Sequence, residues 1–472
     1  MRKQLIRMPT KINARLPFLS PNIALIITGV VFGALGAFSI GPYLDMVEKL
    51  GIRIPQDDMG KDYAVSLVWA VFLGACIIFS PIRHKDKNML LWAWFIKCFI
   101  TLFALLFYEA YYPSDAPGYW ASTLPSNPFN VDRIDDSFMD VLNEEKLTSL
   151  NMHYLILNYN NMVPDFIVNS YHSCKISFSM VSLMAMYIFY RTSIIITKRE
   201  NQMVFWAFVL FPSLLIWTAR IGKEPIMVFG IAVHAAGLVN WHFKRKLIYL
   251  FMGLAGLSVC AFMRIWIGGL LIVPLFFYSL YANKRFLSKV ALSLLLGIVI
   301  PFFYNLSIQK LSIENNTAGI YKKLNGFQKA NAGGGSAINR PPVAINGPLD
   351  VIKFAPSGIF VALFRPLPWD VPGLLGLLSG MEGLLLLYLF LRAINRIRLK
   401  ELNDPIVVWG IVLVLSWAML YGFVIYNFAT GLRWRTQILP IFLGLLLYLG
   451  RSRSKDQKPF GSKFLNLPEL KK

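Results

Sequence analysis

The feature that most constrains this chain is a series of long apolar runs, separated by short segments rich in Lys and Arg. The runs are roughly 17–25 residues long, which is the length that a helix needs to cross a bilayer core. Strands of a membrane barrel would alternate apolar and polar residues, and these runs do not. The sequence therefore predicts an all-α, polytopic transmembrane helical bundle of about twelve spans, forming one integral membrane domain over residues 1–472.

The apolar runs also predict where the helices and the long loops lie. We expect helices at residues 22–44, 64–80, 89–108, 176–196, 203–217, 226–241, 247–263, 265–282, 286–306, 373–394, 405–426 and 437–449. Two polar segments, 109–174 and 307–372, are predicted to be long outer loops. The second contains an apolar stretch, 354–363, which is too short to span and is typical of a re-entrant or interfacial helix.

Composition and charge support a membrane protein. The chain is 56% hydrophobic and 15% charged, whereas soluble domains carry about 25% charged residues. The net charge of +22 would suggest nucleic acid in a soluble protein. Here the basic residues flank the apolar runs, which indicates cytoplasmic loops and contact with anionic lipids. We therefore expect both termini in the cytoplasm and no nucleic-acid partner.

Neither the cysteines nor the loops suggest a metal or a cofactor. The four cysteines, at positions 76, 98, 174 and 260, are not close-spaced as zinc ligands would be. The phosphate-cradling loop of nucleotide-driven enzymes is missing from the sequence. We therefore expect no metal and no cofactor, and any energy for a reaction must come with the substrate or from a gradient.

Several basic residues fall in short outer turns, where the positive-inside rule disfavours them. They are Arg220, Lys223, Arg264, Arg365, Arg433 and Arg435. Clustered together, they would form a basic pocket at the level of the lipid headgroups. Arginine suits phosphate because its planar guanidinium donates two parallel hydrogen bonds and stays charged. The alternative is that each arginine anchors a helix end by reaching toward lipid phosphates.

Three acidic residues accompany this basic set. Asp115 lies close to the outer surface, where it either forms a turn or accepts a proton from a hydroxyl. Glu224 precedes Pro225 at the start of a helix, so it either caps that helix or orients Arg220 or a substrate hydroxyl. Glu382 lies about ten residues inside a predicted span, where an ionisable side chain indicates a functional site or a buried cation as partner.

The motifs that carry these residues resemble those of bacterial polysaccharide polymerases. The chain contains FPSLLIWTARIGKEP, FRPLPWD followed by an acidic residue in the next helix, and an Arg-rich turn before the final helix. In this pattern it is similar to the Wzy-type O-antigen polymerases and the EpsG-like exopolysaccharide proteins. The matching positions are Pro212, Trp217, Lys223, Glu224, Arg365, Pro366, Pro368, Trp369, Glu382, Asp115 and Tyr119.

The resemblance implies a glycosyl transfer on the periplasmic face of a bacterial inner membrane. The donor would be a glycan on undecaprenyl pyrophosphate and the acceptor a lipid-linked repeat unit, with a flippase and a chain-length regulator as partner proteins. It assigns Arg220, Lys223, Arg264, Arg365, Arg433 and Arg435 to the phosphates, and Asp115 or Glu224 to the acceptor hydroxyl. Glu382 and Trp369 take structural or pairing roles, and no metal is needed.

Three other functions stay open at the level of the sequence. The first is a glycosyltransferase that adds one sugar from a polyprenyl-phosphate donor. The second is a flippase or transporter of lipid-linked glycan, which would be expected to show internal repeats. The third is a non-enzymatic assembly or anchoring protein, which would leave the outer arginines unexplained.

Overall fold

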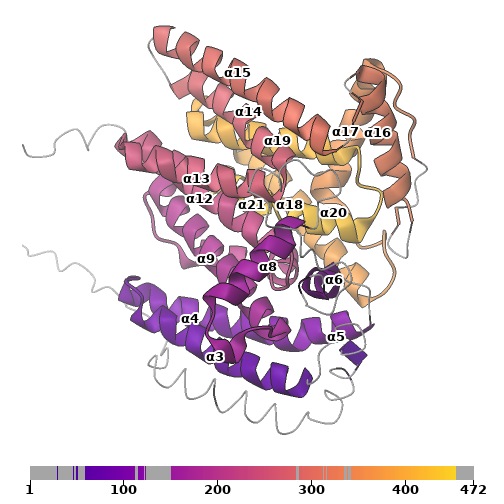
Figure 1. Cartoon of the computed structure of the whole chain (residues 1–472). Coiled ribbons are helices and arrows are strands. Elements are labelled where there is room, and N and C mark those ends of the chain that lie inside the picture. Colours follow the sequence, from indigo (N-terminus) through magenta and orange to yellow (C-terminus); the bar gives the residue numbers. More distant parts are fainter. Residues whose placement is uncertain are drawn as a thin grey trace, which may run out of the picture.

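The protein is helical throughout the described part of the chain (Figure 1). The computed structural model describes residues 29, 46, 49–50, 59–111, 115–121, 123, 150–282, 286–311, 313–314, 316–333, 337–338 and 342–452. The only pairing of β type among these residues is an isolated bridge between Ala337 and Asn427. The predicted helix at 22–44, apart from residue 29, lies outside the described residues, as does the basic tail after residue 452.

The first half of the chain forms long helices joined by short ones. They are α3 (Met59–Phe79), α4 (His84–Phe99), a π-helical turn η1 (Ile100–Ala104), α5 (Leu105–Tyr111), α6 (Asp115–Ala121), α8 (Leu150–Met162), η2 (Asp165–Ile167), α9 (Tyr171–Thr197), α10 (Gln202–Val209), α11 (Pro212–Trp217) and α12 (Lys223–Lys244). The predicted loop 109–174 thus contains α6, α8 and η2.

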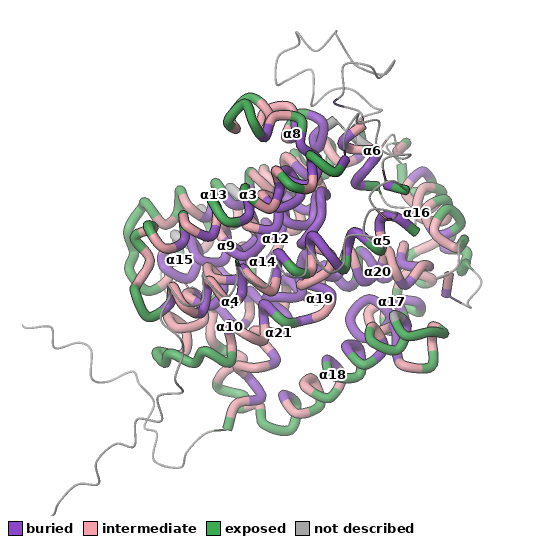
Figure 2. Tube along the Cα trace, turned by 90° about the horizontal axis from the view of Figure 1, so that it is seen from below, coloured by how far each residue is buried: buried purple, intermediate pink, exposed green. Residues whose placement is uncertain are grey.

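The second half continues in the same manner. Its elements are α13 (Leu247–Met263), α14 (Ile265–Ala282), α15 (Phe286–Lys310), α16 (Thr317–Asn331), α17 (Pro348–Phe364), α18 (Leu374–Arg396), η3 (Leu399–Asn403), α19 (Pro405–Gly422), α20 (Phe428–Arg435) and α21 (Leu439–Leu449). The buried residues lie in the middle of this assembly, whereas α15 and α18 carry many exposed ones (Figure 2).

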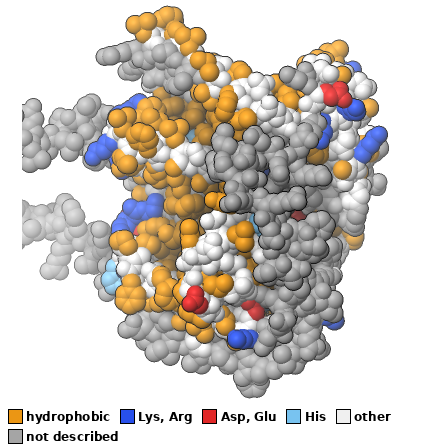
Figure 3. Space-filling model, in the orientation of Figure 1, with side chains coloured by type: hydrophobic (Ala, Val, Ile, Leu, Met, Phe, Trp, Pro, Cys, Tyr) orange, Lys and Arg blue, Asp and Glu red, His pale blue; other side chains and the backbone are white. Residues whose placement is uncertain are grey.

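These helices identify an all-α membrane protein. Among the described residues, 7 helices are long and apolar enough to span a membrane, and three shorter helices, including α13 and α21, are also apolar. Hydrophobic side chains cover much of the described surface in Figure 3. Two predicted ranges, 247–263 and 265–282, coincide with α13 and α14. The number of spans, about twelve, and the cytoplasmic placement of the termini stay predictions.

The predicted helix at 203–217 differs from the structure because it is broken in the middle. α10 ends at Val209, and α11 begins at Pro212. Proline lacks the N–H that a continuous helix needs, and its ring clashes with the preceding turn. The break leaves the first amides of α11 without helical partners. The backbone N–H of Ser213 uses this freedom to donate to Glu382 at 2.7 Å, and its hydroxyl donates to the same carboxylate at 2.6 Å.

Glycines bring α12 and α13 into backbone contact. A Cβ atom added to Gly237 would lie 2.3 Å from the backbone nitrogen of Gly253, and one added to Gly256 would lie 2.4 Å from that of His234. Such close approach is typical of small residues at helix interfaces in membranes. The tight pair fixes the end of α13, where Arg264 follows at once.

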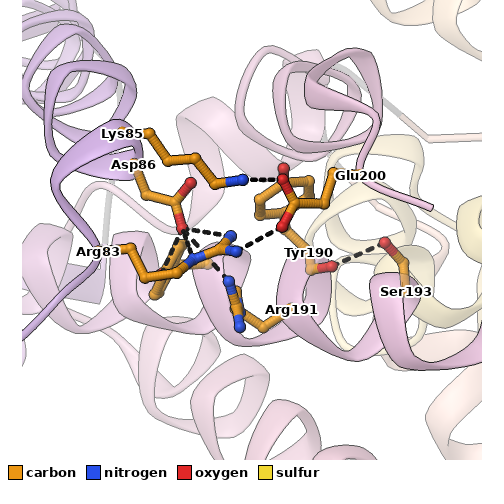
Figure 4. A network of polar contacts seen from close by, with 8 residues as sticks. Arg83, Lys85, Asp86, Tyr190, Arg191, Ser193 and Glu200 are labelled. Atoms are coloured by element: carbon orange, nitrogen blue, oxygen red, sulfur yellow. Dashed lines mark hydrogen bonds and ion pairs between the residues drawn. The ribbon is translucent and has the colours of Figure 1, made fainter. Parts of the chain in front are cut away.

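The basic end of the bundle is where α9, α12, α18 and α21 finish. There Arg83 pairs with Asp86 and Glu200, so that the turn before α4 is tied to the turn after α9 (Figure 4). Arg451, just after α21, pairs with Glu401 at 2.6 Å. The site end is the opposite one, where α12 begins, α19 finishes and α20 follows.

The predicted re-entrant stretch 354–363 is part of a longer helix. α17 begins at Pro348 and packs against α19. After it, the FRPLPWD segment crosses the face of α18 closely. A Cβ atom on Gly383 would lie 2.2 Å from the carbonyl oxygen of Phe364, and one on Gly380 would lie 2.4 Å from the Cα of Pro368. Glycine in α18 therefore positions this motif at the site end.

Candidate functional site

A buried glutamate joined to two arginines forms the centre of the candidate site. Nε of Arg433 donates to Oε1 of Glu224 at 2.7 Å. The same guanidinium pairs with Asp115 through another nitrogen. An amino nitrogen of Arg264 lies 3.7 Å from the same Glu224 oxygen. Four segments that are distant in the sequence therefore meet at one ion-pair cluster, which we call the Arg433 cluster: Asp115, Glu224, Arg264 and Arg433.

Local structure explains how each segment places its residue. Glu224 lies in the first turn of α12, where the helix dipole favours an anion. Gly222 leaves room for it, because a Cβ atom there would lie 2.9 Å from Oε2 of Glu224. Asp115 is the first residue of α6, and Arg264 is the one residue between α13 and α14.

Arg433 lies on α20, a helix of 8 residues that follows α19. Asn427 caps this helix, because its side chain accepts a hydrogen bond from the amide of Thr430 at 3.2 Å. Capping fixes the short helix, and the helix in turn directs Arg433 toward α6 and α12. Arg435, two residues further on, points toward Glu382 of α18 instead.

Arg220 lies in the turn between α11 and α12, beside the cluster. Its guanidinium stacks over the ring of Trp217, with 4.5 Å between the guanidinium carbon and the ring centroid. Its residue is only 4% exposed. An arginine that anchors a helix end in lipid headgroups would keep its guanidinium exposed. Arg220 is buried instead, which does not fit the anchoring alternative.

Two buried polar atoms at this place have no hydrogen-bond partner among the described residues. They are Nε of Arg220, a donor, and Oε2 of Glu224, an acceptor. Buried polar groups in proteins are nearly always paired, so an unpaired donor beside an unpaired acceptor indicates capacity for a ligand. A sugar phosphate offers both phosphate oxygens and hydroxyl groups.

The electrostatics keep the arginines charged. Burial lowers the pKa of Arg433, but the carboxylates of Glu224 and Asp115 outweigh it and raise that pKa above its ordinary value. Burial and the positive charge of Arg433 lower the pKa of Arg220, although an arginine remains protonated at any physiological pH. Three guanidinium groups face two carboxylates here, so the arrangement retains a net positive charge that favours an anion.

Aromatic side chains surround the second arginine of the cluster. A guanidinium nitrogen of Arg264 donates to the hydroxyl of Tyr421 at 3.3 Å, and the indole nitrogen of Trp266 donates to the same hydroxyl at 3.2 Å. The guanidinium of Arg264 also lies over the ring of Trp434, at 5.9 Å from its centroid. Cation–π contacts of this kind hold a guanidinium in one orientation without neutralising its charge.

Tyr119 completes the aromatic side of the site from α6. It is mostly buried, and burial raises the pKa of its hydroxyl, which is hydrogen-bonded to Arg433. The hydroxyl therefore stays protonated and polar beside Asp115. The sequence indicates Tyr119 only as a residue near Asp115, and no motif in it points to Tyr421, Trp266 or Trp434.

Two of the arginines predicted to bind phosphate are engaged elsewhere in the structure. Arg435 is fully buried and pairs with Glu382 at 2.8 Å. It also donates to the carbonyl oxygens of Leu363 at 3.0 Å and Arg365 at 3.1 Å. Arg365 forms a two-point ion pair with Asp370, at 2.7 and 2.6 Å. Among the described residues, neither guanidinium forms an ion pair or a hydrogen bond with the Arg433 cluster.

The remaining predicted residues occupy different surroundings. Lys223 is the first residue of α12 and is 4% exposed. Trp369 is 75% exposed, so it does not pack inside the described part of the protein. A further buried cation, Lys97 of α4, donates to Ser182 and Thr218, each at 2.7 Å. Within the described ranges, no group of three or more metal-ligating side chains is present.

Comparison with known proteins adds no assignment. No family model, no curated protein and no solved structure matches this chain. The function must therefore be argued from the site itself.

Proposed function

We propose that the protein polymerises lipid-linked oligosaccharide repeat units into a surface polysaccharide on the periplasmic face of a bacterial inner membrane. The observation that carries the proposal is the Arg433 cluster, with Arg220 beside it. Its charge is suited to a pyrophosphate leaving group. The positive-inside rule supports the orientation, because the turns at the basic end are rich in Lys and Arg and would face the cytoplasm.

The proposed reaction moves one glycosyl group. A hydroxyl oxygen of the acceptor repeat unit attacks the anomeric carbon of the donor glycan. The bond between that carbon and the pyrophosphate oxygen breaks, and undecaprenyl pyrophosphate leaves with the electron pair. Arg220, Arg264 and Arg433 stabilise the charge that grows on the pyrophosphate, which lowers the barrier electrostatically.

The two carboxylates take different roles in this proposal. The side chain of Asp115 is 54% exposed, so an acceptor hydroxyl can reach it and transfer its proton there. Glu224 is fully buried and already accepts from Arg433. We therefore assign Glu224 to holding the arginines in place and Asp115 to the acceptor hydroxyl. Lys223 stays a candidate phosphate ligand.

The experiment uses cells from which the gene has been deleted and which are complemented with either the wild-type chain or the Arg433→Ala variant. The length of the surface glycan is compared between the two. The variant should leave single repeat units on the outer face, because loss of one stabilising group costs about 10²–10³-fold in rate. Lys322→Ala is the matched control, since Lys322 pairs only at the surface with Glu314. Protein levels are checked by immunoblot.

The outcomes also separate the alternative functions. Repeat units that lack one sugar would indicate a single-sugar glycosyltransferase and not a polymerase. Complete units trapped on the cytoplasmic face would identify a flippase. Long polysaccharide chains in cells with a normal level of the Arg433→Ala variant would show that the Arg433 cluster does not take part in the reaction.

A further inference from the structure

A second site lies at the basic end, away from the Arg433 cluster. It is a cavity of about 370 Å³ between α9, α10, α12, α19 and α21. This volume falls within the range of about 300–1,000 Å³ that is usual for ligand pockets. Its deep walls are apolar and include Phe208, Val239 and Leu445. We propose that it binds an anionic phospholipid of the cytoplasmic leaflet, with one acyl chain inside and the phosphate at the rim.

The rim of the cavity carries the charge that this ligand requires. Arg199, Asn201 and Ser452 line it and are exposed. No ion pair to a described residue is formed by Arg199, whereas the neighbouring Glu200 is occupied by Arg83 and Lys85. A free guanidinium above an apolar cavity is complementary to an amphiphile with an anionic head.

A buried donor on a residue of the cavity wall supports the same ligand. Trp409 lines the wall and is 3% exposed, yet its indole nitrogen has no hydrogen-bond partner among the described residues. It lies four residues after Pro405, the first residue of α19, so it is about 6 Å below that helix end. This depth places the indole N–H below the charged rim, where the ester carbonyl of a phospholipid is an acceptor.

Two other occupants fit less well. The lipid substrate of the proposed reaction would place its pyrophosphate at the site end, whereas this cavity has its polar rim at the basic end. The chain's own tail, residues 453–472, carries six basic and two acidic residues, so it is repelled by the two arginines that line the cavity, Arg199 and Arg451. The inference depends on the basic end facing the cytoplasm and not on the polymerase reaction.

The test uses the full chain, with Leu445 replaced by photoactivatable leucine, in vesicles of equal phosphatidylglycerol and phosphatidylcholine content. Irradiation and mass spectrometry identify what is attached at this position. We expect phosphatidylglycerol to be captured in preference to phosphatidylcholine. Arg199→Ala should weaken that capture about fivefold, because one basic residue near an anionic headgroup contributes about that factor.

Gly444 provides a matched pair of variants. A Cβ atom there would meet only the ring of Phe208, at 3.8 Å, so Gly444→Ala should keep the capture. Gly444→Phe should fill the cavity and abolish it. If Gly444→Phe fails to fold, the effect of Arg199→Ala on phosphatidylglycerol capture still tests the proposal, because Arg199 is exposed and its replacement leaves the core intact.

Three results would overturn the proposal. Equal capture of both lipids would mean contact with bulk lipid only. Attachment to residues 453–472 would identify the tail as occupant, and attachment to a polyprenyl lipid from the cell membrane would identify the substrate. Capture of phosphatidylglycerol that is insensitive to Arg199→Ala would remove the proposed headgroup site.

Discussion

Replacing Arg435 by methionine should destabilise the protein strongly, because it leaves Glu382 buried without its cation. Both side chains are about 1% exposed, and they pair at 2.8 Å. Removal of one partner of a buried ion pair costs about 3–5 kcal/mol. Ser213 still donates twice to the carboxylate, so we expect the lower part of this range, about 3 kcal/mol. The measurement is thermal or denaturant unfolding of purified protein at constant detergent concentration.

The double variant Arg435→Met, Glu382→Leu provides the control. It removes both charges, so no carboxylate is left buried without a cation. The remaining cost comes from the groups that lose a partner, at about 1–3 kcal/mol each: the carbonyl oxygens of Leu363 and Arg365, and the amide and hydroxyl of Ser213. The double variant should therefore be less destabilised than the sum of the two single variants. Two results would refute a structural role for this ion pair: losses of unfolding free energy that are additive, or a loss below about 1 kcal/mol in Arg435→Met. Arg435 would then again be a candidate phosphate ligand.

Three further predictions concern the break between α10 and α11, the Arg365–Asp370 ion pair and the orientation in the membrane. Ser213→Ala should cost about 1.5–3 kcal/mol of unfolding free energy, since a hydrogen bond to a charged group is lost; an unchanged unfolding midpoint would contradict this. Burial raises the pKa of Asp370, but Arg365 and the Leu367 amide lower it by a larger amount, so the pKa lies below its ordinary value. The ionised group therefore stabilises the fold above pH of about 3.9, and the advantage of wild type over Asp370→Asn should fade as the pH falls below that value. Lys322→Cys, in a chain without its natural cysteines, should react with a membrane-impermeant maleimide from the periplasmic side; labelling only after permeabilisation would reverse the orientation.

Periodicity and hydropathy predict most of the long helices because crossing a membrane imposes a length and an apolar composition. The ranges of α13 and α14 could be read to the residue, since Arg264 interrupts two apolar runs. The break at Pro212 was missed, because hydropathy stays high across it. Hydropathy also indicated only part of α17, whose first turns are more polar.

The candidate site was predictable in its residue types but not in its pairings. The sequence indicates six basic residues at outer turns, yet hydropathy gives no information on which carboxylate each one meets. Arg433 and Arg435 are two residues apart on α20, and they point to different partners, Glu224 and Glu382. Tyr421 has no signal in the sequence, because a tyrosine inside an apolar span is typical of packing as well as of binding.

The contacts of Arg433 also bear on the order of events during synthesis. Its partners Glu224 and Asp115 precede it by 209 and 318 residues. Membrane insertion proceeds from the N-terminus, so both carboxylates are in place long before the ribosome reaches α20. Until then Glu224 is a buried acid without its principal counter-ion. A nascent or truncated chain that ends before residue 433 therefore lacks the cation that pairs with Glu224 and Asp115, and we expect it to be locally unstable at this end of the bundle.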